Sequence, residues 1–268
     1  MGSEVCIRDG CEAAASHLAG VAVVPSITAG LTDAGVHALA QVAHLDFPAH
    51  AKLTRHAVRE GLSFHLRPHA VVALDAAPVG PDWNARFSAT WRSYEYRILN
   101  RRARPALAEG HVWHVKSPLD IARMQDGANH LVGAHDFTSF RAAACQANSP
   151  LRTLDDLRIR REGDHVLVST RARSFLHHQV RNMVGTLKLV GIGQWEPERV
   201  AHALRARTRA AAGPPPRPEG FNRNGWDSTP AGLPGAYRRR CRKGHASNNP
   251  RLSALSHCSR GFSAWRHP

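Results

Sequence analysis

GLTDAGVHA, residues 30–38, is the stretch of this chain on which the interpretation of all the rest depends. Two glycines, Gly30 and Gly35, flank a Thr32-Asp33 pair, and small residues then lead into a predicted strand at 41–47. Because glycine allows a positive φ or a close backbone approach, a carboxylate at such a turn can project into a cleft. In the alternative interpretation, Asp33 only closes or caps an ordinary loop. Taken alone, the stretch favours that alternative, and the other motifs of the chain reverse the preference.

Charge and composition narrow the class of protein. The chain of 268 residues has a net charge of +15, which favours a polyanionic partner, nucleic acid before membrane. Residues 222–268 hold nine Lys and Arg and one acid, so +8 of this charge lies there and +7 in the first 221 residues. No apolar run approaches the roughly 18 residues of a membrane span, and residues 1–16 lack a basic segment followed by an apolar one, so we expect no secretory signal there. Five scattered cysteines without a CxxC pair suit a reducing cytoplasm, where we expect this protein.

The periodicity of the chain predicts a mixed architecture. Residues 86–100 alternate apolar and charged side chains, as is typical of a strand with one buried face. A hairpin is predicted at 154–161 and 165–171, and helices are predicted from Ser117, at 174–190 and at 196–212. Hairpins intermixed with helices favour an α+β fold over a doubly wound parallel sheet. Beyond Phe221 no period persists, so residues 222–268 are predicted to be a basic, disordered tail.

Four segments stand out by their order along the chain. They are AGLTDAGVHALAQVAHLD (29–46), NARFSATWRSYEYRILN (84–100), HDFTSFRA (135–142) and RSFLHHQVRNMVGTLKLVG (173–191). Together they resemble the signature segments of the tRNA pseudouridine synthase A family, with a match that spans residues 30–221. The resemblance implies an antiparallel sheet flanked by helices, in two similar halves. We therefore expect an atypical N-terminal segment at 1–28, two halves of a catalytic domain at 29–116 and 117–221, and the tail at 222–268.

The resemblance also implies an activity. Members of this family isomerise uridine to pseudouridine at positions 38–40 of the tRNA anticodon stem-loop. The reaction breaks the N1–C1′ bond, turns the uracil and joins C5 to C1′. It involves no redox change, and the implied enzyme uses no cofactor and no metal. The implied partners are tRNA and a second copy of the chain, because the family works as a homodimer.

The site residues follow from their positions in the motifs. Asp33 matches the family's catalytic aspartate, and Arg181 is the catalytic-site cation expected to keep that carboxylate ionised. Tyr94 matches the tyrosine whose ring can stack on the target base. The residues expected to bind the RNA substrate are Tyr94, Thr32, Arg86 and Arg92.

Alternatives stay open at several of these positions. Tyr94 can be a core tyrosine, as Tyr96 is expected to be, and Arg181 can be a surface RNA contact or a structural ion-pair partner. Leu31 stands where the family has an arginine, and residues 1–28 lack the family's first strand. The second hypothesis is therefore a catalytically impaired member that binds structured RNA without turnover. A third, a basic RNA-binding protein unrelated to modification, would be preferred if Asp33, Tyr94 and Arg181 lay far apart.

Overall fold

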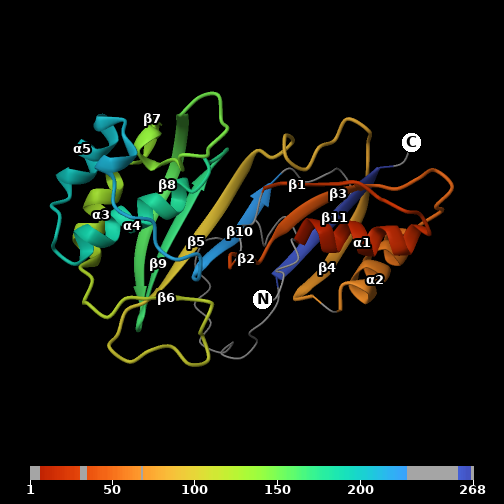
Figure 1. Cartoon of the computed structure of the whole chain (residues 1–268), viewed down its shortest axis with the longest axis horizontal. Helices are drawn as coiled ribbons and strands as arrows, with labels where there is room; N and C mark the ends of the chain where they lie inside the picture. The colour runs from red at the N-terminus through yellow and green to blue at the C-terminus, as the bar shows by residue number, and fades with distance from the viewer. Residues whose placement is uncertain (1–6, 31–34, 68, 228–258, 267–268) are drawn as a thin grey trace. The chain divides into compact units, whose positions relative to one another are not determined.

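The computed structural model describes residues 7–30, 35–67, 69–227 and 259–266 (Figure 1). Its contacts divide the chain into two compact units. The first comprises Met1–Ala34, Ala38–Thr90 and Arg223–Pro268, and the second comprises Gly35–His37 and Trp91–Asn222. The sequence placed a boundary at residue 116 between two similar halves; that is a different division of the chain, and it stays a prediction.

The first unit packs two helices on a four-stranded sheet. The helices are α1 (Ile7–Ala19) and α2 (Arg55–His65), and the strands run in the order β1 (Ser26–Thr28), β3 (Gln41–Asp46), β11 (Ser259–Arg266) and β4 (Val71–Val79). Thr54 caps the start of α2: its hydroxyl accepts a hydrogen bond of 3.2 Å from the Ala57 N–H and so satisfies a backbone group that the helix leaves free. Val58 and Leu62, one turn apart on α2, are fully buried against the sheet.

The second unit is built on a larger sheet. Its strands run in the order β2 (His37–Ala38), β10 (Phe221–Asp227), β5 (Trp91–Leu99), β9 (His165–Ala172), β8 (Leu151–Glu162) and β7 (Gly133–Asp136), and β6 (Trp113–His114) pairs with β5. The pairs β5–β9, β9–β8 and β8–β7 are antiparallel, whereas β6 runs parallel to β5. The hairpin β8–β9 turns at Gly163, whose φ of +58° favours glycine. This hairpin confirms the one predicted from sequence.

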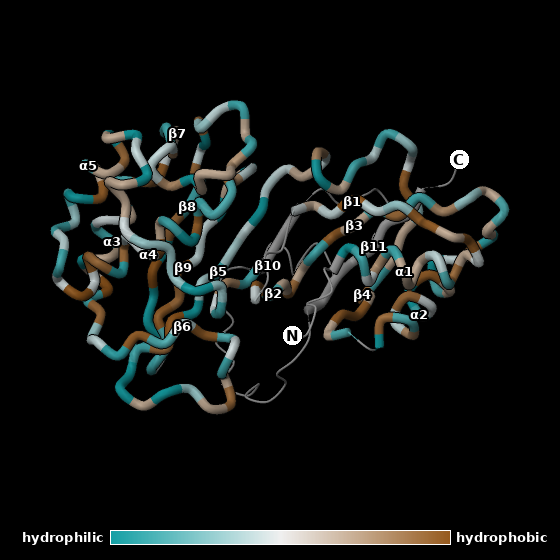
Figure 2. Tube along the Cα trace, viewed as in Figure 1, coloured by the Kyte–Doolittle hydropathy of each residue, from teal (hydrophilic) through white to brown (hydrophobic). Residues whose placement is uncertain are grey.

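Three α-helices, α3 (Ile121–Asn129), α4 (Gln179–Gly191) and α5 (Glu198–Ala206), pack on this sheet, with short 3₁₀ turns η1 (Thr138–Phe140) and η2 (Arg209–Ala211) beside them (Figure 1). The core joins strand residues such as Ile98 and Val168 to Met124 of α3 and Leu187 of α4, all fully buried. Hydrophobic and hydrophilic residues alternate along these elements (Figure 2). The predicted α+β fold, an antiparallel sheet flanked by helices, is confirmed.

The C-terminal region differs in part from its prediction. Two stretches of the tail expected to be disordered are strands, β10 at its start and β11 near its end. Residues 228–258 lie outside the described residues. Among the helices that the structure describes, none has the length and apolar character needed to cross a bilayer.

Candidate active site

The chain that directly follows the Thr32-Asp33 pair is anchored to the second unit. Gly35 has a φ of +77°, and a Cβ added to it would lie 3.0 Å from the Pro218 side chain, so both the turn and the close approach require glycine. The His37 ring is hydrogen-bonded to the Gly110 carbonyl at 3.0 Å and lies 4.3 Å from the ring of His111. Thr32 and Asp33 themselves, like Leu31, lie outside the described residues.

Arg181 lies in the first turn of α4 and is held at both terminal nitrogens. One of them donates to the Pro216 carbonyl at 2.9 Å, and the other lies 3.3 Å from Nε2 of His178. A guanidinium has donors in a fixed plane and no acceptor, so two such partners fix the orientation of that plane. The second predicted catalytic residue is therefore a half-buried cation of defined orientation.

The start of α4 is shaped by side chains that bond to the backbone. The Gln179 side chain accepts a hydrogen bond of 2.8 Å from the Leu176 N–H. Buried Asn182 donates to the Phe140 carbonyl at 2.6 Å and accepts from Arg209 at 3.1 Å. The Gln179 bond is local, and bonds of this kind compete with the helical pattern and set where a helix begins. The Asn182 bonds place α4, and with it Arg181, against η1 and η2.

Tyr94 and Tyr96 lie two positions apart on β5, and the rings of both are stacked on the ring of Phe221. The half-buried Tyr94 ring is stacked on Phe221 at 5.0 Å and meets Phe175 edge-on at 5.2 Å. Tyr96 is fully buried, which confirms its predicted place in the core, and its hydroxyl donates to the Arg217 carbonyl. Burial raises the pKa of Tyr96 well above its usual value; the Arg181 charge opposes this shift and the Glu219 charge adds to it. The Tyr96 hydroxyl is therefore neutral in the folded protein.

Residues 216–221 contact Arg181, both tyrosines of β5 and Gly35. This connecting segment supplies the Pro216 carbonyl to Arg181, the Arg217 carbonyl to Tyr96, the Pro218 ring to Gly35 and the Phe221 ring to Tyr94. The sequence alone marks these residues only as the end of the recognisable pattern. The available signal was the proline run at 214–216, which fixes φ and removes N–H donors, so that its carbonyls are left to accept from side chains. The structure thus brings Arg181 and Tyr94 to one segment.

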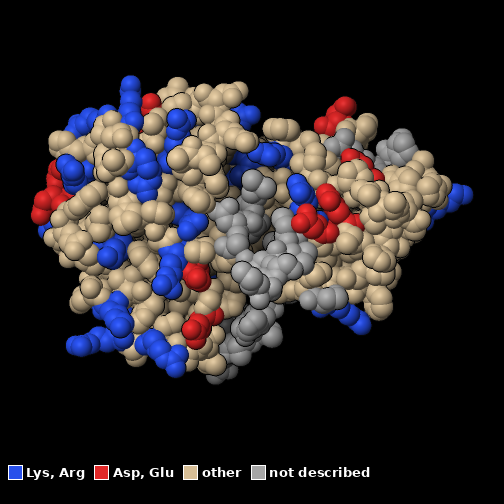
Figure 3. Space-filling view, in the orientation of Figure 1, with Lys and Arg blue, Asp and Glu red and all other residues tan. Residues whose placement is uncertain are grey.

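The two arginines predicted to bind substrate lie in different units. Arg92, on β5, donates to the Arg173 carbonyl at 2.6 Å and belongs to the second unit. Arg86 belongs to the first unit and is exposed in a turn whose shape is fixed by Asn84, which accepts from the N–H groups of residues 86 and 87 at 2.9 and 3.2 Å. In the view of Figure 3 the second unit, on the left, carries more basic than acidic side chains. These positions suit contacts to phosphates, each within its own unit.

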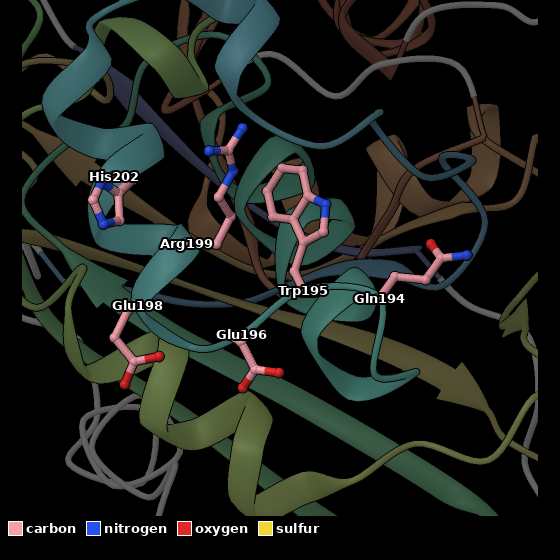
Figure 4. A pocket seen from close by; sticks show the side chains of 6 residues that line it. All are labelled: Gln194, Trp195, Glu196, Glu198, Arg199 and His202. Atoms are coloured by element: carbon pink, nitrogen blue, oxygen red, sulfur yellow. The ribbon is translucent and has the colours of Figure 1, made fainter.

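A surface hollow lies apart from these residues, beside the end of α4 and the start of α5. Its lining residues are Gln194, Trp195, Glu196, Glu198, Arg199 and His202 (Figure 4). The Arg199 guanidinium lies 5.4 Å from the centre of the Trp195 ring. Two carboxylates in the lining would repel a phosphate, so this hollow is a poor candidate for contact with nucleic acid.

Comparisons with known proteins find similar sequences over most of the chain. A family model described as tRNA pseudouridine synthase matches residues 128–222. A tRNA pseudouridine synthase A from Gluconobacter oxydans is 61% identical over 210 residues, which cover 78% of this chain and 76% of the relative. Proteins of the same name from Acidiphilium cryptum and Rhodospirillum rubrum are 59% and 55% identical, each over 216 residues; these cover 80% of this chain and 84% and 76% of those relatives.

Proposed function

This chain belongs to the tRNA pseudouridine synthase A family and is an isomerase that converts uridine in tRNA to pseudouridine; from this premise we propose that Asp33 is its catalytic nucleophile and that Arg181 pairs with it. The target is a uridine at positions 38–40 of the anticodon stem-loop. A base inside a stem is out of reach of a carboxylate, so the enzyme extrudes the nucleotide before reaction.

One observation carries the pairing of Asp33 with Arg181. Gly35, two residues after Asp33, lies against Pro218, and Pro218 is two residues after the carbonyl that holds Arg181. Two residues of extended chain span at most about 7 Å. Arg181 and the glycine two residues after Asp33 thus both contact the connecting segment, which supports the proposed pair. A guanidinium beside the carboxylate stabilises its charged form, which is the form that can act as a nucleophile.

The remaining site residues have distinct proposed roles. The half-buried Tyr94 ring stacks on the extruded uracil, and the Thr32 side chain contacts the substrate next to Asp33. Arg86 and Arg92 bind phosphates, since A-form RNA is recognised mainly by shape and by its backbone. A Tyr94→Phe variant would keep the stacking surface, whereas Tyr94→Ala would remove it.

Release of tritium from [5-³H]uridine-labelled tRNA tests the role of Asp33, because C5 loses its hydrogen when it joins C1′. Asp33→Asn should lower the single-turnover rate by about 10³-fold or more, the order found when a nucleophile is removed, while tRNA binding is retained. Asp126→Asn, which changes an exposed carboxylate on α3, is the matched control. Turnover by Asp33→Asn at the wild-type rate would refute the assignment.

Leu31 motivates the second candidate function, a family member that binds structured RNA without turnover. The arginine that the family carries at this position can donate to phosphate and help to hold a flipped base, whereas leucine can only act as an apolar wedge. In this case the wild-type chain binds tRNA without releasing tritium, and Leu31→Arg restores release. Release by the wild-type chain excludes the impaired form.

The enzyme so proposed acts in the cytoplasm as a homodimer across which the tRNA lies. The scattered cysteines of the chain and the location of its substrate support the cytoplasm. Light scattering on the purified chain, with and without tRNA, measures the assembly directly. A mass of one chain in both conditions would exclude the dimer.

A further inference from the structure

His178, immediately before α4, has a backbone conformation that is unusual for its residue type. Its φ of 59° and ψ of 8° place it in the left-handed region. Among the residues that the structure describes, only His178 and Arg207 have a positive φ without being glycine. Side chains other than glycine meet a steric penalty there, so such a conformation persists only where the surroundings impose it, and it is concentrated at functional sites.

The contact of the His178 side chain with Arg181 gives a reason for this backbone conformation. Nε2 of His178 lies 3.3 Å from a terminal nitrogen of Arg181, three residues further along. Because the guanidinium can only donate, a hydrogen bond between the two side chains requires Nε2 as the acceptor and the ring proton on Nδ1. The ring of His177 lies 4.0 Å from the His178 ring and supports it from the side.

The left-handed backbone conformation of His178 is linked to the contact of its side chain with Arg181. A residue before a helix normally adopts the β region, from which its side chain caps the N–H groups of the first turn. His178 makes no such cap. In the left-handed region its side chain instead reaches Arg181, while the Pro216 carbonyl holds the other end of the same guanidinium at 2.9 Å. We propose that His178 is a positioning residue, which fixes the orientation of the Arg181 guanidinium plane for the reaction; this inference rests on the proposed function.

Two substitutions separate the backbone from the ring. His178→Gly keeps the left-handed conformation without strain and removes the acceptor. His178→Gln places an amide oxygen near the position of Nε2 and keeps a side chain in the strained conformation. In tritium release we expect His178→Gly to lower kcat by about 10- to 100-fold, the cost of a misplaced catalytic group, with KM for tRNA within about twofold. His178→Gln should recover most of that loss.

Arg207→Gly is the matched control, because it relieves a left-handed residue (φ 49°) that has no contact with Arg181 among the described interactions. Its kcat should equal that of the wild type. A double-mutant cycle distinguishes a role through Arg181 from a purely structural role. If His178 acts through Arg181, His178→Gly should lower kcat little further in an Arg181→Ala background. Full additivity of the two losses, or a wild-type kcat for His178→Gly, would overturn the inference.

A second measurement distinguishes failure of this inference from failure of the proposed function. The ¹⁵N chemical shifts of the imidazole, assigned by comparison with His178→Gln, report which ring nitrogen carries the proton. We expect the proton on Nδ1 in the wild type, whether or not the chain turns over tRNA. A proton on Nε2 would overturn the positioning role, whereas absence of tritium release with the proton on Nδ1 would count against the proposed function alone.

Discussion

Tyr96 shows how one buried hydroxyl ties the strand β5 to the connecting segment. The ring is fully buried and its hydroxyl donates to the Arg217 carbonyl, so the hydroxyl and the carbonyl oxygen each have a hydrogen-bond partner away from water. Burial raises the pKa of the hydroxyl, the Arg181 charge opposes the shift and the Glu219 charge adds to it. The folded protein therefore keeps the Tyr96 proton at a pH at which the unfolded chain releases it.

Tyr96→Phe removes this hydrogen bond and leaves the Arg217 carbonyl without its donor. We expect the free energy of unfolding at pH 7 to fall by about 1–3 kcal/mol, the cost of an unsatisfied buried group. Because the pKa is raised in the folded state, the wild type loses stability as the pH rises above about 10, where the unfolded tyrosine ionises. The variant lacks this loss, so the difference between the two proteins should shrink from pH 7 to pH 10.5.

Urea unfolding at pH 7, 9 and 10.5 measures this difference. Equal midpoints at pH 7, or a gap that widens with pH, would contradict the prediction. Tritium release at pH 7 should be nearly unchanged under conditions where the variant is folded, because Tyr96 has no role in the reaction. A large loss of turnover in folded Tyr96→Phe would instead indicate that the connecting segment has moved.

At the scale of single residues, the motifs predicted which residues belong to the core or to the site, but not which residues they contact. The place of Tyr96 in the core followed from its alternation along a strand and is confirmed. Arg181 was named from its motif, but its contact with Pro216 joins residues 35 positions apart, and a local pattern cannot encode that. The conformation of His178 was also unpredictable, because a left-handed φ is signalled by glycine and not by histidine.

At the scale of elements, predicted and observed boundaries differ where side chains bond to the backbone. The strand predicted from residue 86 begins at Trp91, because Asn84 and Ser88 hydrogen-bond with backbone groups and fold the preceding residues into a turn. The helix predicted from Ser174 begins at Gln179 because the residues before it form the turn that ends at His178. Periodicity locates an element, whereas local bonds of this kind decide its ends.

Gly185 in the middle of α4 is required by packing. A Cβ added there would overlap the Pro214 carbonyl and come within 3.1 Å of the Pro216 ring. Since backbone cannot yield as a flexible side chain does, Gly185→Ala should displace residues 214–216 or bend α4. We expect a loss of about 1–3 kcal/mol in the free energy of unfolding, typical of overpacking. Turnover should fall too, because Pro216 holds Arg181.

Gly80→Ala is the control for this variant. A Cβ on Gly80 meets nothing within 4 Å, and its φ lies outside the positive range. Its thermal unfolding and tritium release should therefore match the wild type. If Gly185→Ala unfolded at the same temperature as Gly80→Ala, the contact of α4 with the proline run would be looser than the geometry requires.

At the scale of the whole molecule, chain order and spatial order differ. Strand β11, at the end of the chain, lies in the sheet of the first unit and runs parallel to both of its neighbours, β3 and β4. Sequence reasoning predicted disorder there, because the tail lacks periodicity and is rich in Arg, Pro and Ser. A pairing between residues more than 180 positions apart leaves no local trace in sequence, so neither periodicity nor composition could predict it.

Because, among the described strands, β3 and β4 are joined only through β11, breaking β11 should loosen the first unit and spare the second. Ser263 pairs with Ala43 of β3 and with Ala76 of β4. Ser263→Pro removes an N–H and the freedom of φ at the centre of the ladder, whereas Ser263→Ala keeps both. In hydrogen exchange we expect faster exchange along β3 and β4 for the proline variant only, with β8 and β9 unchanged. Equal protection of β3 and β4 in the two variants would show that the first unit holds its sheet without β11.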